Sequence, residues 1–202
     1  MIKIAAFIRP KKKINQEILK LKKKVKKYFG KQPYLSHPPH CTIFTMLVSE
    51  KILKEKKFFK NLIITSSSKN EIKILKPAIF YNDPITGGKT MYFKIKKNSF
   101  LKILQTRLLQ KFLYFRKING NEKFKFSWMN LNVKKHGYPF IKSKWIPHFT
   151  ISSIKNVKNE NKFLTNFLKI KIKAKEIVKK IDIYKIKKDK HIYLWSINIK
   201  IK

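Results

Sequence analysis

Hydrophobic and polar residues alternate in a way that predicts strand, helix and strand in the first quarter of the chain. The apolar run at residues 2–8 is bounded by Pro10 and predicts a buried strand. Residues 14–28 then carry apolar side chains at steps of four and three, the spacing of one helix face. Gly30 is placed to end that helix, and residues 40–48 are rich in β-branched and apolar types, as strands are. The apolar face of the helix is expected to comprise Ile14, Ile18, Leu21, Val25 and Tyr28.

The same order returns in the second half. Residues 90–97 alternate like a strand, residues 98–115 have helical spacing with Asn98 or Ser99 as the cap, and residues 148–154 predict another strand. The apolar face of this second helix is expected to comprise Leu101, Leu104, Leu108, Phe112 and Phe115. No Gly/Ser-rich linker divides the chain. We therefore expect one domain, residues 1–202, with two related units at roughly 1–48 and 89–155.

The segments outside these units are shorter. We expect a short helix within 49–59, a strand at 71–81, a hairpin turn at 82–89, a helix at 159–169, and two strands around a Lys-Lys-Asp-Lys turn within 176–201. The turn at 82–89 contains Asp-Pro and Gly-Gly, which favour a chain reversal.

The net charge of +40 bears on the class of binding partner but does not identify it. A surface of this sign attracts polyanions, RNA above all. The abundance of Lys, Ile, Asn and Phe would equally follow from an AT-rich genome without selection for binding. The lysine runs at 11–13 and 22–24 are expected to be solvated helix faces.

The cysteine count and the lengths of the apolar segments indicate the cellular compartment. Cys41 is the single cysteine, so no internal disulfide is possible. The N-terminal apolar run is too short for a signal peptide, and no window approaches a membrane span. We expect a cytoplasmic protein without a membrane partner, and a monomer.

The candidate chemistry lies in a phrase that the chain contains twice. His40-Cys-Thr-Ile and His148-Phe-Thr-Ile each follow a proline and begin a predicted strand, 148 − 40 = 108 residues apart. Strand side chains alternate between faces, so His40 shares a face with Thr42, and His148 shares a face with Thr150. If the halves pack about a pseudo-twofold axis, two imidazoles and two hydroxyls meet in one cleft.

Two histidines in one cleft suit phosphodiester chemistry without a metal. A neutral imidazole removes a proton from the nucleophile, and a protonated one supplies a proton to the leaving oxygen. The threonine hydroxyls are suited to donate hydrogen bonds to the non-bridging oxygens of the phosphate.

These paired motifs resemble those of the 2H phosphoesterase superfamily, in particular the branch of RNA 2′,3′-cyclic phosphodiesterases and 2′-5′ RNA ligases. The resemblance implies an α+β, bilobal, pseudo-twofold fold, with two antiparallel sheets flanking a central cleft and helices on the outside. It implies His40, Thr42, His148 and Thr150 as the catalytic set, and hydrolysis of 2′,3′-cyclic phosphate ends of RNA or related nucleotides. Reverse 2′-5′ ligation would use a 5′-hydroxyl in place of water.

Two details of the resemblance stay open. We assign His40 as the acid and His148 as the base, although pseudo-symmetric halves can exchange these roles. The gap between the motifs is longer than the family's usual spacing, and the connection at 118–143 is expected to carry the excess and to reshape the cleft.

Other polar and aromatic residues have a functional and a structural interpretation. Arg9 ends the first predicted strand and is a candidate phosphate ligand, and Trp145 and Tyr138 are candidates for stacking on a base or for packing at the rim. Cys41 is expected in the core, and His136 and His191 in exposed loops. His37 with His40 lacks the partners of a metal site, so we expect no metal and no cofactor.

Two alternatives to the enzyme are kept. One is a basic RNA-binding module of the same fold without turnover, and the other is a hydrolase of a non-RNA cyclic phosphate. Intact His and Thr in both motifs argue against the first alternative.

Overall fold

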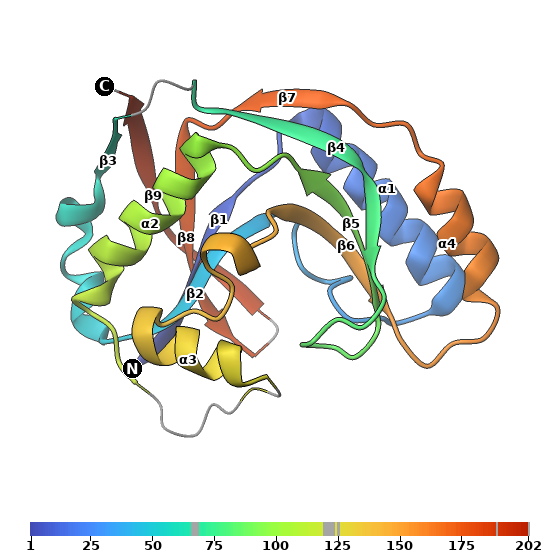
Figure 1. The fold of residues 1–202 in the computed structure, drawn as a ribbon, viewed down its shortest axis with the longest axis horizontal. Helices are drawn as coiled ribbons and strands as arrows, with labels where there is room; N and C mark the ends of the chain where they lie inside the picture. The colour runs from blue at the N-terminus through green and yellow to red at the C-terminus, as the bar shows by residue number, and fades with distance from the viewer. Residues whose placement is uncertain (66–68, 119–123, 125, 189, 202) are drawn as a thin grey trace.

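Two sheets form the frame of the computed structural model, which describes residues 1–65, 69–118, 124, 126–188 and 190–201. The strand order of the five-stranded sheet is β2 (Cys41–Val48), β1 (Ile2–Ile8), β8 (Lys180–Lys187), β9 (Lys190–Ile201) and β3 (Asn61–Ile64). That of the four-stranded sheet is β6 (His148–Ile154), β5 (Lys89–Ile95), β4 (Glu71–Phe80) and β7 (Ala174–Ile177). Neighbouring strands run antiparallel except β3 and β9 (Figure 1). The expected α+β fold with two antiparallel-rich sheets is confirmed.

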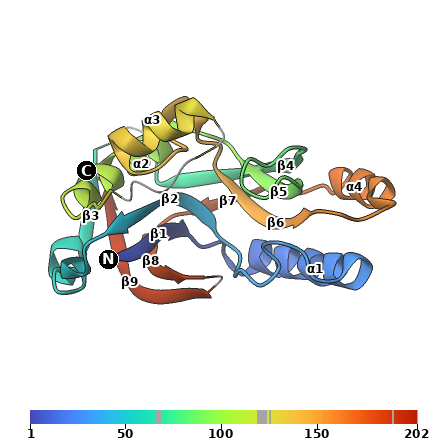
Figure 2. The ribbon, with the colours of Figure 1, turned by 90° about the horizontal axis from the view of Figure 1, so that it is seen from below.

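Each of the two main helices packs against the sheet of the other half. Helix α1 (Lys12–Phe29) follows β1 but lies against β6, whereas α2 (Ser99–Leu113) follows β5 and lies against β2 and β3. Figure 1 shows α1 and α4 (Glu160–Leu168) beside the four-stranded sheet, and α2 beside the five-stranded one. This exchange joins the halves, because each helix buries its apolar face on strands that its own unit does not contain. Seen from below, the helices lie outside the two sheets (Figure 2).

Helix α1 differs from its predicted pattern at two residues. Ile14, Ile18 and Val25 are buried as expected, and Gly30 ends the helix with a φ of 66° that favours glycine. Tyr28, expected on the apolar face, is 67% exposed. Lys22, expected in a solvated run, is only 6% exposed. The apolar spacing predicts only the centre of the buried face of α1. Which residues at the margins of that face are buried depends on the strands against which the helix packs.

Helix α2 confirms its predicted cap and its predicted buried face. The side chain of Asn98 accepts a hydrogen bond from the Leu101 backbone N–H at 2.9 Å, so Asn98 is the cap. All five predicted core residues are buried, although the helix ends at Leu113, before Phe115.

Buried Gln105 of α2 fastens the free edge of β2. Its side-chain amide donates to the carbonyl oxygen of Ile43 at 2.9 Å and to that of Phe140 at 3.1 Å. β2 is an edge strand, so carbonyls on its open side need partners from outside the sheet.

Replacing Gln105 with leucine should lower the free energy of unfolding by about 1–3 kcal/mol, because two carbonyls would lose their donor in a buried site. Urea unfolding measures the change, and Gln110→Leu, at an exposed position of the same helix, is the matched control. Equal stability of the two variants would contradict the edge-fastening role.

The remaining segments differ from their predictions in helix type and number. The short helix expected within 49–59 is two 3-10 helices, η1 (Glu50–Leu53) and η2 (Lys56–Phe59), and the helix at 159–169 is α4. The connection at 118–143 holds a helix that was not predicted, α3 (Ser127–His136), and η3 (Lys142–Lys144). Residues 119–123 and 125 of that connection, and Asp189 of the Lys-Lys-Asp-Lys turn, lie outside the described residues.

Within the described residues, no helix combines the length and the apolar character needed to cross a membrane.

Candidate active site

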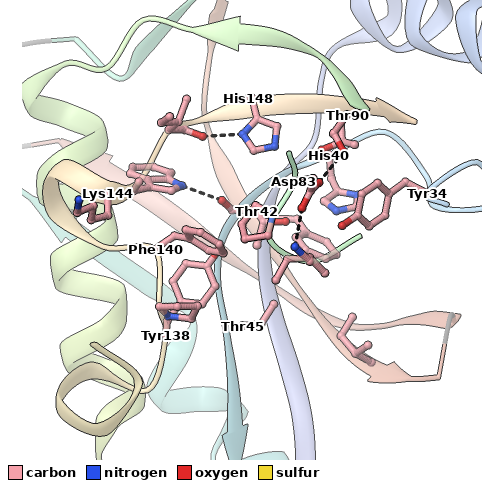
Figure 3. A pocket seen from close by; sticks show the side chains of 18 of the residues that line it. Tyr34, His40, Thr42, Thr45, Asp83, Thr90, Tyr138, Phe140, Lys144 and His148 are labelled. Atoms are coloured by element: carbon pink, nitrogen blue, oxygen red, sulfur yellow. Dashed lines mark hydrogen bonds between the residues drawn. The ribbon is translucent and has the colours of Figure 1, made fainter. Parts of the chain in front are cut away.

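The two His-x-Thr motifs lie at the beginnings of two strands that contact each other, with His40 just before β2 and His148 as the first residue of β6. β2 and β6 are the end strands of their sheets and contact one another. His40, Thr42, His148 and Thr150, all half-buried, line a single cavity of about 680 Å³. Figure 3 shows His148, Thr42 and His40 around this pocket. The structure thus brings together the four residues that the duplicated phrase singled out.

A matching irregularity follows each threonine. In the first sheet the register passes from Ala6–Phe44 to Phe7–Thr42, so Ile43 is left without a partner. In the second sheet Ile151 is left out in the same way. Both isoleucines are fully buried. Such a bulge turns the residues beside it, so the isoleucine of each phrase anchors the strand where the threonine must face the cavity.

The two imidazoles are held alike. Nδ1 of His40 lies 2.6 Å from the carbonyl oxygen of Pro38, and Nδ1 of His148 lies 2.6 Å from that of Ile146. A carbonyl only accepts, so each Nδ1 carries the proton and donates it. Nε2 is then the nitrogen of each ring that can take up or release a proton.

An aromatic ring supports each imidazole from the neighbouring strand. Phe7, whose register partner is Thr42, stacks on His40 with ring centroids 3.9 Å apart. Tyr92, whose register partner is Thr150, lies 4.9 Å from His148, ring centroid to ring centroid. The correspondence between the halves therefore extends to the residue behind each catalytic candidate.

The electrostatic surroundings of the two imidazoles differ. Burial lowers the pKa of His40 well below 6.5; the Pro38 hydrogen bond opposes this, and the nearby His191, His37 and Arg9 add to it. Burial also lowers the pKa of His148, but the Ile146 hydrogen bond and the charge of Asp83 oppose the shift. Two further imidazoles and a guanidinium group thus lie near His40, and a carboxylate lies near His148.

Asp83 is held in place by the turn between β4 and β5. One carboxylate oxygen accepts the Ile85 backbone N–H at 2.8 Å, and the other accepts the Thr90 hydroxyl at 2.5 Å (Figure 3). Asp83 is 7% exposed, and it is the one carboxylate among the described residues that line the cavity. The sequence of this segment predicted only a turn.

The three residues proposed as substrate ligands have different positions. Arg9 does not line the large cavity; it borders a smaller one with Glu176 and Asp182. Trp145 and Tyr138 line the large cavity but are only 3% and 7% exposed. The Trp145 indole N–H donates to the Thr42 carbonyl oxygen at 3.1 Å, so this ring is part of the wall. Their contact with a substrate stays a prediction.

Two other predictions about histidine need correction. His191 was expected in an exposed turn, but it is half-buried, lines the cavity and lies 5.1 Å from His40, ring centroid to ring centroid. The β8–β9 hairpin carries it over Phe7, a placement for which the sequence offers no local signal. His136 was expected in a loop, but it ends α3 and is half-buried.

Two more cavity residues were not identified from the sequence. Lys22 lines the cavity from α1, and Trp128 lines it from α3. The Nζ of Lys144 lies 5.2 Å from the centre of the Trp128 ring. The connection at 118–143 therefore forms part of the cavity wall through its described residues.

Neither a reactive thiol nor a group of metal ligands is found among the described residues of this site. Cys41 is fully buried, and burial raises the pKa of its thiol to about 12. Among the described residues no three His, Cys, Asp or Glu side chains are grouped as metal ligands.

Comparison with solved structures shows which fold this is. The protein TT0787 of Thermus thermophilus aligns over 98% of this chain and 97% of its own, at 14% identity and a TM-score of 0.61. A crystal structure of a phosphoesterase aligns over 98% of both chains, at 12% identity and a TM-score of 0.51. The chain has the fold of a solved phosphoesterase. The fold that the 2H resemblance implied is thereby confirmed.

Neither a family model nor a curated protein sequence matches the chain. At 14% and 12% identity the likeness shows the fold, and the side chains in the cavity must support any reaction.

Proposed function

We propose that this protein is a 2H-type phosphodiesterase that hydrolyses 2′,3′-cyclic phosphate ends of RNA or related nucleotides. The observation that carries the proposal is the pair of imidazoles in one cavity, each with Nδ1 bound to a carbonyl and Nε2 left for proton transfer. A threonine hydroxyl follows each imidazole by two residues, from Thr42 of β2 and from Thr150 of β6. One proton acceptor, one proton donor and two hydrogen-bond donors are what cleavage of a phosphodiester requires.

The surroundings of the imidazoles support a division of labour opposite to the one first expected. His40, beside His37, His191 and Arg9, favours the neutral form and would remove a proton from the attacking water. His148, near Asp83, keeps a proton more readily and would donate it to the departing ribose oxygen. The water oxygen bonds to phosphorus, the P–O bond to the ribose oxygen breaks, and a phosphate monoester remains. Thr42 and Thr150 would donate to the non-bridging oxygens.

2′-5′ ligation would use the same residues in the same roles, with a 5′-hydroxyl in place of water. His40 would take the proton of the 5′-hydroxyl, whose oxygen bonds to phosphorus, and His148 would donate a proton to the departing ribose 3′-oxygen, which leaves a 2′-5′ phosphodiester. We include ligation in the proposal as a second activity of the same cavity.

The test is turnover of two substrates in EDTA: 2′,3′-cyclic AMP, and a short RNA with a 2′,3′-cyclic phosphate end. We expect a monoester product from one or both, since no step above uses a metal. Tight RNA binding without turnover would favour the basic RNA-binding module, and turnover of only non-nucleotide cyclic phosphates would favour the second alternative. We expect the protein to be a monomer and to be cytoplasmic. A reduced, buried Cys41 is in keeping with that compartment.

The pH dependence of kcat/KM should peak on the acidic side of 6.5. The pKa values of both imidazoles are lowered, so the proton that His148 must donate is lost as the pH rises through its depressed value. As the pH falls through the pKa of His40, this imidazole takes up a proton and can no longer act as the base, so kcat/KM decreases. Because kcat/KM reports the free enzyme, its profile from about pH 4 to 9 tests this directly. A maximum above pH 7 would contradict it.

A further inference from the structure

One side of the cavity gathers cationic and imidazole groups. Lys22, His37, His40 and His191 all line it. Ring centroids of His191 lie 4.4 Å from His37 and 5.1 Å from His40, and those of His37 and His40 are 6.4 Å apart. The group therefore extends from the catalytic candidate His40 through His191, which interacts electrostatically with Lys22.

Lys22 is the unusual member of this group. Its neighbours Lys23 and Lys24 are exposed, as lysines on a helix normally are. Lys22 is 6% exposed, and its ammonium group donates to the backbone carbonyl of Tyr34. No carboxylate of the described residues forms an ion pair with it. Burial lowers the pKa of Lys22 to about 8, so the group is still mainly charged at neutral pH.

One member of this group and one residue that acts on it electrostatically have nitrogen atoms without hydrogen-bond partners. Nδ1 of His191 and Nη1 of Arg9 are buried without a hydrogen-bond partner in the described part of the chain. Burial lowers the pKa of His191 to about 4, and His37, Arg9 and Lys22 add to the shift, while no acidic group opposes it. Asp83, the carboxylate of the cavity, is bonded to its own turn and to Thr90.

A buried positive charge without a counter-ion is costly, and an anionic ligand removes the cost. The phosphate that would react between His40 and His148 is one anion. Lys22, however, is among the charges that act on His191 and not among those that act on His40. We propose that Lys22, with His191 and His37, forms a second phosphate subsite beside the reaction centre. It would bind the next phosphate of the substrate, on the 5′ side of the nucleotide that carries the cyclic end.

This inference rests on the proposed function and names its substrate more closely. A second phosphate can be the phosphodiester of an RNA chain or the 5′-phosphate of a mononucleotide, and the cavity chemistry is the same for both. Three substrates separate them: adenosine 2′,3′-cyclic phosphate, its 5′-phosphorylated form, and a dinucleotide with a cyclic end.

The decisive variant is Lys22→Met, which keeps the length of the side chain and removes the charge. We expect the dinucleotide to be the better substrate of the wild type. The variant should lose about tenfold more kcat/KM on the dinucleotide than on the cyclic mononucleotide, the loss expected when one charged contact to a phosphate is removed. Lys23→Met, an exposed neighbour, should leave both values unchanged. A similar selective loss with the 5′-phosphorylated mononucleotide would identify a terminal phosphate as sufficient.

A binding measurement separates this inference from the reaction itself. Titration calorimetry with 3′-AMP and with a dinucleotide 3′-phosphate needs no turnover, so it applies even if no cyclic phosphate is hydrolysed. Selective weakening of the dinucleotide complex by Lys22→Met supports the subsite. Equal weakening of both ligands, or of neither, overturns it. Thermal unfolding should show the variant at least as stable as the wild type, because an apolar side chain replaces a buried charge.

Discussion

Replacing either His40 or His148 with alanine should lower kcat/KM for a 2′,3′-cyclic phosphate by about 10²–10⁴-fold, the range for loss of one general acid or base. Each imidazole would transfer a proton that the other cannot reach in the same step. Both residues are half-buried, line a cavity and make one backbone hydrogen bond through the imidazole, so we expect both variants to fold. Steady-state kinetics on 2′,3′-cyclic AMP measures the effect.

His136→Ala is the matched control for both variants. This histidine ends α3 and does not line the cavity, so its removal should leave kcat/KM unchanged. The double variant His40→Ala/His148→Ala should lose less than the product of the two single losses, because residues that act in one step are not additive. Wild-type turnover in either single variant would end the two-histidine proposal.

Substrates with a good leaving group should distinguish the acid from the base. Thymidine 3′-(p-nitrophenyl phosphate) has no 2′-hydroxyl and releases p-nitrophenolate, which needs no proton to depart. With His148 as the acid, His148→Ala should cleave this compound within about tenfold of the wild-type rate, whereas His40→Ala should remain about 10²–10⁴-fold slower. The release of p-nitrophenolate is followed by its absorbance.

The assignment depends on surroundings that differ between otherwise matching halves. Asp83 lies near His148, and three cationic or imidazole groups lie near His40. If His40→Ala rather than His148→Ala cleaved the aryl ester at nearly the wild-type rate, His40 would be the acid, as first expected from the sequence. Equal impairment of both variants would show that neither imidazole acts only on the leaving group.

The duplicated phrase was readable in the sequence because its signals are local. Alternation along a strand places His40 with Thr42, and Ile43 in the core, whatever the rest of the chain does. The same holds for Leu104 and Phe112 of α2, whose spacing alone defined a buried face. Helix α3 was missed because its sequence has only weak apolar periodicity and buries Met129 alone.

The sequence by itself determined the strands and helices of the two related units and the four candidate catalytic side chains, since these follow from short-range periodicity or from a repeated phrase. The two sheets were expected only from the family resemblance. Tertiary structure alone decided what stands beside each imidazole. Lys22 faces the cavity because α1 crosses to the other sheet, His191 arrives with a distant hairpin, and Asp83 comes from a turn between strands. The electrostatic interactions of an imidazole depend on its distance in space from charged groups, and residue spacing along the sequence does not give that distance.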